Sequence, residues 1–98
     1  MDLDYLDFDY SEDADGIGTW DALACVPPER LPAVKAEAAQ LLDWAQRTFP
    51  GQQGPCEEGG AWDYDLHTHA EADGRVTLAL SLSGSPAFGE ALRATFRL

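Results

Sequence analysis

Residues 61–83 read AWDYDLHTHAEADGRVTLALSLS, and this stretch decides the fold. Apolar and polar side chains alternate from Ala61 to Ala72 and again from Arg75 to Ser83. Alternation with a period of two is typical of a strand with one buried face and one exposed face. Asp73-Gly74, between the two runs, is a strong signal for a two-residue hairpin turn. The stretch therefore predicts two antiparallel strands.

A second pair of strands is expected at the N-terminal end. Residues 3–10 place Leu6, Phe8 and Tyr10 on one face, and residues 19–26 alternate in the same way. The segment between them, SEDADGIG, is rich in turn-forming residues. We therefore expect these two strands to form a hairpin, which ends at Pro27-Pro28 because proline cannot continue a ladder.

Two segments have the periodicity of helices. Between Leu31 and Phe49 the apolar residues recur at steps of three, four and seven, and Pro50-Gly51 ends the pattern. Near the C-terminus, Ser85-Pro86 has the composition of a helix start, and residues 86–97 continue at helical spacing. Residues 92–98 also alternate at period two, so a fifth strand is the alternative for this tail.

These elements predict one α+β domain spanning residues 1–98. The favoured architecture has two layers, with a four-stranded antiparallel sheet and two helices on one of its faces, in the order ββαββα. The alternative order is ββαβββ. In the favoured arrangement the other face of the sheet is open to solvent, and the acidic and histidine side chains point there.

Charge narrows the classes of partner. Eighteen acidic residues against six basic ones give a net charge of −12, which repels nucleic-acid backbones and anionic membranes and attracts basic proteins. No apolar run approaches the roughly 20 residues of a membrane span, and no basic leader is visible, so a cytoplasmic location is expected. The Ala-, Arg- and Asp-rich, Lys-poor composition suggests a bacterial source.

The expected open face of the sheet concentrates acidic side chains. Alternation puts five polar residues of the third strand on one face, and the acids of the first strand point the same way. Like charges held side by side on a sheet repel, and few basic residues are near in sequence to compensate. The candidate binding surface consists of Asp7, Asp9, Asp63, Asp65, His67, His69 and Glu71.

The same face allows a metal-binding alternative. Two histidines at i and i+2 on one strand can chelate a divalent ion, with a nearby carboxylate as a further ligand. His67, His69 and Asp65 are the candidate ligands, and Zn²⁺ is the candidate ion. The plainer interpretation is a polar, solvated face of a half-exposed antiparallel sheet, which needs no cofactor.

Patterns for catalysis are weak. No nucleophile elbow or phosphate-binding glycine loop is present, so the sequence does not predict an enzyme or catalytic residues. The run Asp13-Ala14-Asp15-Gly16 resembles part of a calcium loop, but Ala22 stands where the bidentate glutamate is required. Cys25 and Cys56 lack disulfide-framework or zinc-ribbon spacing.

Three functional hypotheses follow from these patterns. The favoured one is a small non-catalytic protein-binding or inhibitory module that presents an acidic sheet face to a basic partner protein. The first alternative is a protein, or metal-dependent enzyme, that binds a divalent ion through His67 and His69. The second is a homo-oligomerising domain whose sheet face or edge meets a second copy.

Overall fold

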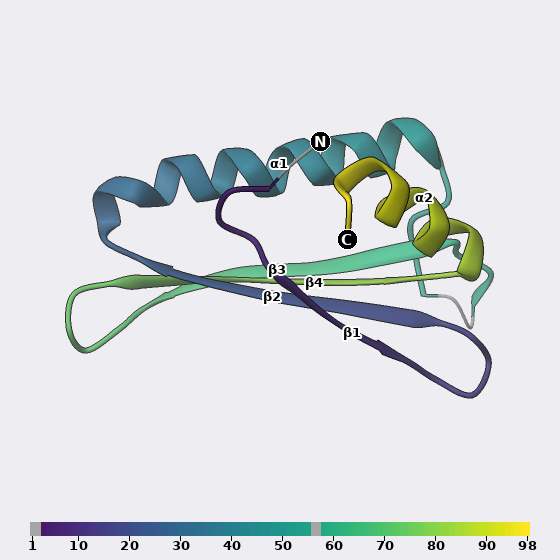
Figure 1. The fold of residues 1–98 in the computed structure, drawn as a ribbon, viewed down its shortest axis with the longest axis horizontal. Coiled ribbons are helices and arrows are strands. Elements are labelled where there is room, and N and C mark those ends of the chain that lie inside the picture. Colours follow the sequence, from purple (N-terminus) through teal and green to yellow (C-terminus); the bar gives the residue numbers. More distant parts are fainter. Residues whose placement is uncertain (1–2, 56–57) are drawn as a thin grey trace.

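The computed structural model describes residues 3–55 and 58–98. Figure 1 shows two layers, with both helices above one face of a sheet and the lower face of the sheet uncovered. The predicted α+β architecture and the order ββαββα are therefore confirmed. The elements are β1 (Phe8–Glu12), β2 (Gly18–Val26), the 3₁₀ turn η1 (Pro28–Arg30), α1 (Leu31–Thr48), β3 (Trp62–Ala70), β4 (Val76–Gly84) and α2 (Pro86–Phe96).

The sheet is antiparallel throughout and has the strand order β1-β2-β4-β3. Both predicted hairpins form, β1 with β2 and β3 with β4. The first turn is closed by Asp13, whose Oδ1 accepts the N–H groups of Asp15 and Ile17, each at 2.9 Å. The central contact of the sheet is the long-range pairing of β2 with β4. This pairing leaves β1 and β3 as the two edge strands.

Helix α1 lies along the sheet and buries the predicted apolar stripe, including Val34, Ala38 and Leu41. Trp44 lies beside this stripe and is half-buried, packing against Phe88 and Phe96 with ring centroids 5.9 and 5.3 Å apart. It is therefore a residue of the core edge. No helix of the described part of the chain is long and apolar enough to cross a membrane.

The C-terminal segment is a helix, and the alternative fifth strand is wrong. Ser85 caps α2, because its hydroxyl oxygen accepts the N–H of Phe88 at 3.3 Å. Helical spacing turns Phe88, Leu92 and Phe96 toward the sheet, where all three are buried. A strand would have turned Ala94 and Leu98 toward the core together with Leu92 and Phe96, but both are exposed, whereas Gly89, on the helical stripe, is buried.

The N-terminal strand is shorter than the sequence predicts. Residues 3–7 form an irregular arm that leaves the sheet and reaches α1 (Figure 1). The carboxylate of Glu37, on α1, accepts backbone N–H groups from Asp4, Tyr5 and Leu6. These bonds replace the ladder bonds that a longer strand would have made, and they hold Leu6 in the core.

Strand β3 is exposed on both faces over most of its length. Trp62 is fully buried, but Tyr64 and Leu66, on the same face, are 37% and 38% exposed. Thr68 and Ala70 are also exposed. The side chains of β3 therefore alternate between the two faces as predicted, but the apolar face is buried only at Trp62. The rest of this face is exposed because an edge strand has a neighbouring strand on one side only.

Candidate functional site: the outer face of the sheet

Strand register brings acids from three strands into one row on the outer face. Asp9 of β1 is paired with Asp21 of β2. Asp21 is paired with Ser81 of β4, and Ser81 is paired with Asp65 of β3. Paired residues share a face of the sheet, so these side chains all point away from the helices. The row crosses the whole width of the sheet.

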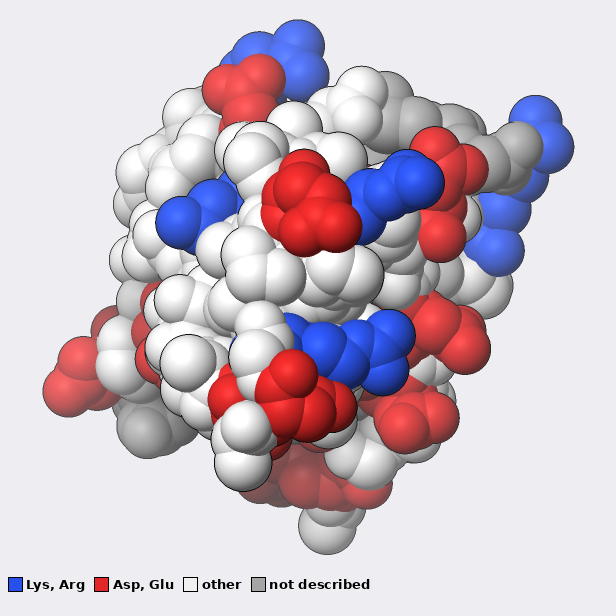
Figure 2. All heavy atoms as spheres, turned by 90° about the vertical axis from the view of Figure 1, so that its left-hand side faces the viewer, with Lys and Arg blue, Asp and Glu red and all other residues white. Residues whose placement is uncertain are grey.

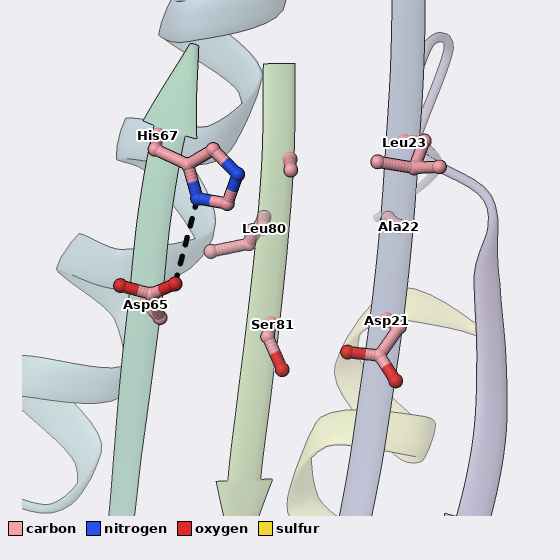
Figure 3. Close-up of a pocket in the computed structure, with 8 residues that line it drawn as sticks. Asp21, Ala22, Leu23, Asp65, His67, Leu80 and Ser81 are labelled. Carbon is pink, nitrogen blue, oxygen red and sulfur yellow. Dashed lines mark ion pairs between the residues drawn. The ribbon is translucent and has the colours of Figure 1, made fainter. Parts of the chain in front are cut away.

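An exposed leucine lies beside this row. Leu23 of β2 is 69% exposed, although its neighbours Ala22 and Ala24 are buried on the other face. It borders a shallow hollow of about 240 Å³ between β2 and β3. Figure 3 shows Asp21 and Leu23 on one side of this hollow and Asp65 and His67 on the other, with β4 between them. The hollow thus combines an apolar side chain with two carboxylates.

Basic side chains are absent from the strands. The described strands β1 to β4 contain no Lys or Arg, so the outer face has no fixed positive charge of its own. The basic residues lie on helices, turns and the C-terminal end. In Figure 2 they are interspersed with acids, whereas the coloured spheres nearest the lower margin of the view are red. The field of the outer face is therefore negative.

The paired aspartates have a cost in stability. Asp9 and Asp21 are directly opposite each other, and like charges in this position are unfavourable by roughly 0.2–1 kcal/mol. Both are exposed, and neither has a basic neighbour on the strands that flank it. Asp63 differs, since its Oδ1 accepts the N–H of Tyr64 at 2.9 Å and a Gln53 side-chain N–H at 3.3 Å. Asp63 thus also has a local structural role.

The two histidines are each bound to an acid of their own hairpin. His67 Nδ1 is 3.5 Å from Asp65 Oδ2, and His69 Nε2 is 2.8 Å from Glu71 Oε1. Glu71 Oε1 also accepts the hydroxyl of Thr77 at 2.6 Å. The imidazole rings are parallel to within 23°, with centroids 6.5 Å apart. Both rings are largely exposed.

The candidate metal ligands do not converge on one point. Within residues 3–55 and 58–98, no group of three or more His, Cys, Asp or Glu side chains is placed to hold a metal ion. Each histidine instead has its own carboxylate partner. Metal binding by His67, His69 and Asp65 stays a prediction that titration with Zn²⁺ can test.

The structure divides the predicted surface into two parts. Asp63, Asp65, His67, His69 and Glu71 do lie together, on β3 and the turn that follows it. Asp7 and Asp9 were expected to join the histidines if the first strand lay nearby, and it does not. Asp9 lies on β1 at the opposite edge, three strand spacings or about 14 Å away. Asp7 was expected on the same strand but lies before it, in the arm that leaves the sheet.

Two residues of the face were missed as candidates. Asp21 and Leu23 occupy the odd positions of β2, whose even positions are apolar, so alternation already indicated that they point outward. Their significance depends on strand order, which alternation does not determine. Cys25 is exposed on the same strand, and Cys56 lies outside the described residues.

Comparison with known proteins identifies no relative. No protein-family model matches the chain, and neither the curated proteins nor the solved structures contain a match.

Proposed function

We propose that this chain is a non-catalytic protein-binding domain whose outer sheet face docks a basic partner protein. The observation that carries the proposal is the row of Asp9, Asp21 and Asp65 beside the exposed Leu23, on a face whose strands contain no Lys or Arg. In the free protein these acids repel one another, and in a complex the basic side chains of the partner would offset that repulsion by attracting them.

The two kinds of group have different roles in this proposal. The carboxylates steer a basic partner toward the face and reject acidic ones, an effect that is larger on association rate than on affinity. Leu23 supplies apolar area at the centre of the contact, where burial contributes about 25 cal/mol per Å². A partner that fits would present Lys or Arg side chains around an apolar recess.

Capture from a lysate of the source organism, followed by mass spectrometry, tests this function. We expect immobilised protein to retain a basic protein that is released as salt rises, because screening weakens exposed charge pairs. The triple variant D9N/D21N/D65N should lose at least about tenfold in affinity, equivalent to about 1.4 kcal/mol.

A matched variant controls for net charge. E29Q/D43N/E90Q removes the same amount of charge from exposed acids that lie outside the strands, and it should bind like the original chain. Equal binding by the two triple variants, or retention of the partner in about 1 M salt, would contradict docking through the outer face.

A further inference from the structure

Strand β3 lies at the edge of the sheet, and its outer edge has features that allow pairing with a strand of another molecule. Its pairing with β4 runs without interruption from Trp62 to Ala70. Natural edge strands are commonly protected by proline, lysine, a bulge or short length, and β3 has none of these. A loop covers the edge only at its start, where Gln53 bridges to Trp62, and the acidic and basic side chains of β3 are two aspartates and two histidines. The opposite edge, β1, is five residues long, and the chain before it turns away toward α1.

The backbone groups at this edge can be assigned from bonds at both ends of the strand. Ala61 C=O accepts from Ser85 N–H and Glu71 N–H donates to Arg75 C=O, so the odd-numbered residues bond toward β4. Trp62 C=O accepts instead from Gly54 N–H, on the outer side. Alternation in an antiparallel ladder then turns the N–H and C=O groups of Tyr64, Leu66 and Thr68 away from β4, toward the free edge.

The order of aspartates and histidines along β3 is complementary to itself. Asp63 and Asp65 precede the centre of the strand at Leu66, and His67 and His69 follow it at the same distances. When two copies align antiparallel with Leu66 opposite Leu66, Asp65 lies opposite His67 of the second copy and Asp63 lies opposite His69. Every acid–base pair occurs twice because of the two-fold symmetry.

Neighbouring registers keep only half of these Asp–His pairs and add unfavourable ones. A centre at Asp65 places Asp63 opposite His67 but Asp65 opposite its own copy. A centre at His67 places Asp65 opposite His69, but it also places the two copies of His67 opposite each other and Asp63 opposite Glu71. The Leu66 register also puts the Asp–His pairs at non-hydrogen-bonded positions, where facing Cα atoms are only about 4.5 Å apart and side chains interact most closely.

We infer that two copies of this chain associate through their β3 edges, antiparallel and centred on Leu66, to form a continuous eight-stranded sheet. The N–H and C=O groups of Leu66, the N–H of Thr68 and the C=O of Tyr64 form the backbone bonds of this ladder. The Tyr64 N–H already donates to Asp63 Oδ1 at 2.9 Å and is not counted among them. The half-exposed Tyr64 and Leu66 side chains become covered on the helix side. The contact is small, so we expect a weak dimer with a dissociation constant of at least micromolar order.

Exchanging the aspartate and the histidine on either side of Leu66 tests the register. D65H alone places His opposite His, and H67D alone places Asp opposite Asp, so each should weaken dimerisation about tenfold in analytical ultracentrifugation. The double variant D65H/H67D again places Asp opposite His and should restore the dimer to within about threefold. Failure of the double variant to recover, or a chain that stays monomeric to about 500 μM, overturns the inference.

Two further pairs of variants test the edge itself. T68P removes an outward N–H and should abolish the dimer, whereas T68A should keep it; equal dimerisation of the two contradicts pairing at this edge. In a C25S/C56S background, L66C should form an interchain disulfide, since facing Cα atoms lie about 5.5 Å apart. T68C should not, because its two copies lie four residues apart along the ladder, and cross-linking of T68C instead would refute the register.

Dimerisation and binding of a basic partner can be distinguished experimentally. Salt should strengthen the dimer by screening the repulsion between two chains of charge −12, whereas it should weaken binding of a basic protein. H67D adds negative charge to the outer face, so it should impair the dimer without impairing a basic partner.

Discussion

Replacing Glu37 with alanine tests how the N-terminal arm is attached to the domain. Glu37 Oε2 accepts the N–H groups of Tyr5 at 2.9 Å and Leu6 at 2.7 Å, and Oε1 accepts that of Asp4. The Glu37 side chain is only 9% exposed, and Leu6 belongs to the core. E37A therefore removes one acceptor group from three donors that have no helix or sheet partner.

The expected loss of stability follows from the burial of each donor. The Leu6 N–H is buried, and leaving it unpaired costs about 1–3 kcal/mol. The N–H groups of Asp4 and Tyr5 are part-buried and regain water, so each loses about 0.5–1 kcal/mol. The total is about 2–5 kcal/mol, a large share of the roughly 5–15 kcal/mol that stabilises a domain. At about 4–8 °C per kcal/mol, Tm should fall by roughly 10 °C or more.

Urea unfolding followed by tryptophan fluorescence measures this loss. E37Q keeps one carbonyl oxygen as an acceptor and should lose about half as much free energy of unfolding. Q40A changes an exposed residue of the same helix and should stay within about 0.5 kcal/mol of the original chain. An E37A variant as stable as Q40A would refute the attachment of the arm through this carboxylate.

Three other outcomes are expected. A Cβ at Gly84 would lie 2.2 Å from Phe88 Cδ2, so G84A should lower the free energy of unfolding by about 1–3 kcal/mol; thermal denaturation showing no change relative to S83A would contradict this packing. L23A should leave stability within about 0.5 kcal/mol but weaken binding of the captured basic partner about tenfold; an undiminished affinity argues against an apolar anchor. In a C56S variant, Cys25 should react fully with a thiol reagent without denaturant, because it is exposed; protection of the thiol would show that the outer face is covered.

The sequence alone predicted the order of the elements and the side to which each strand residue points, but it did not locate the start of the first strand and left a strand as the alternative for the C-terminal helix. Both properties depend on local spacing, which is two residues for a strand and 3.6 for a helix. Asp73-Gly74 and Ser85-Pro86 marked a hairpin and a helix start for equally local reasons. Alternation along their own strand thus assigns Asp65 and His67 to the solvent side.

Other features depended on contacts between distant residues. Strand β1 starts only at Phe8 because the arm before it bonds to Glu37, about 30 residues away in the sequence. The row of Asp9, Asp21 and Asp65 required the order β1-β2-β4-β3, which also separated Asp9 from the histidines.

What the sequence by itself determined was therefore the alternation that sends the acids and histidines outward, together with the acid-then-histidine order about Leu66. Only the tertiary structure decided that β3 is an edge strand with its outward backbone groups unpaired by β4. Alternation is a property of neighbouring residues along one chain, whereas an edge exists only after strands far apart in the sequence have chosen their partners.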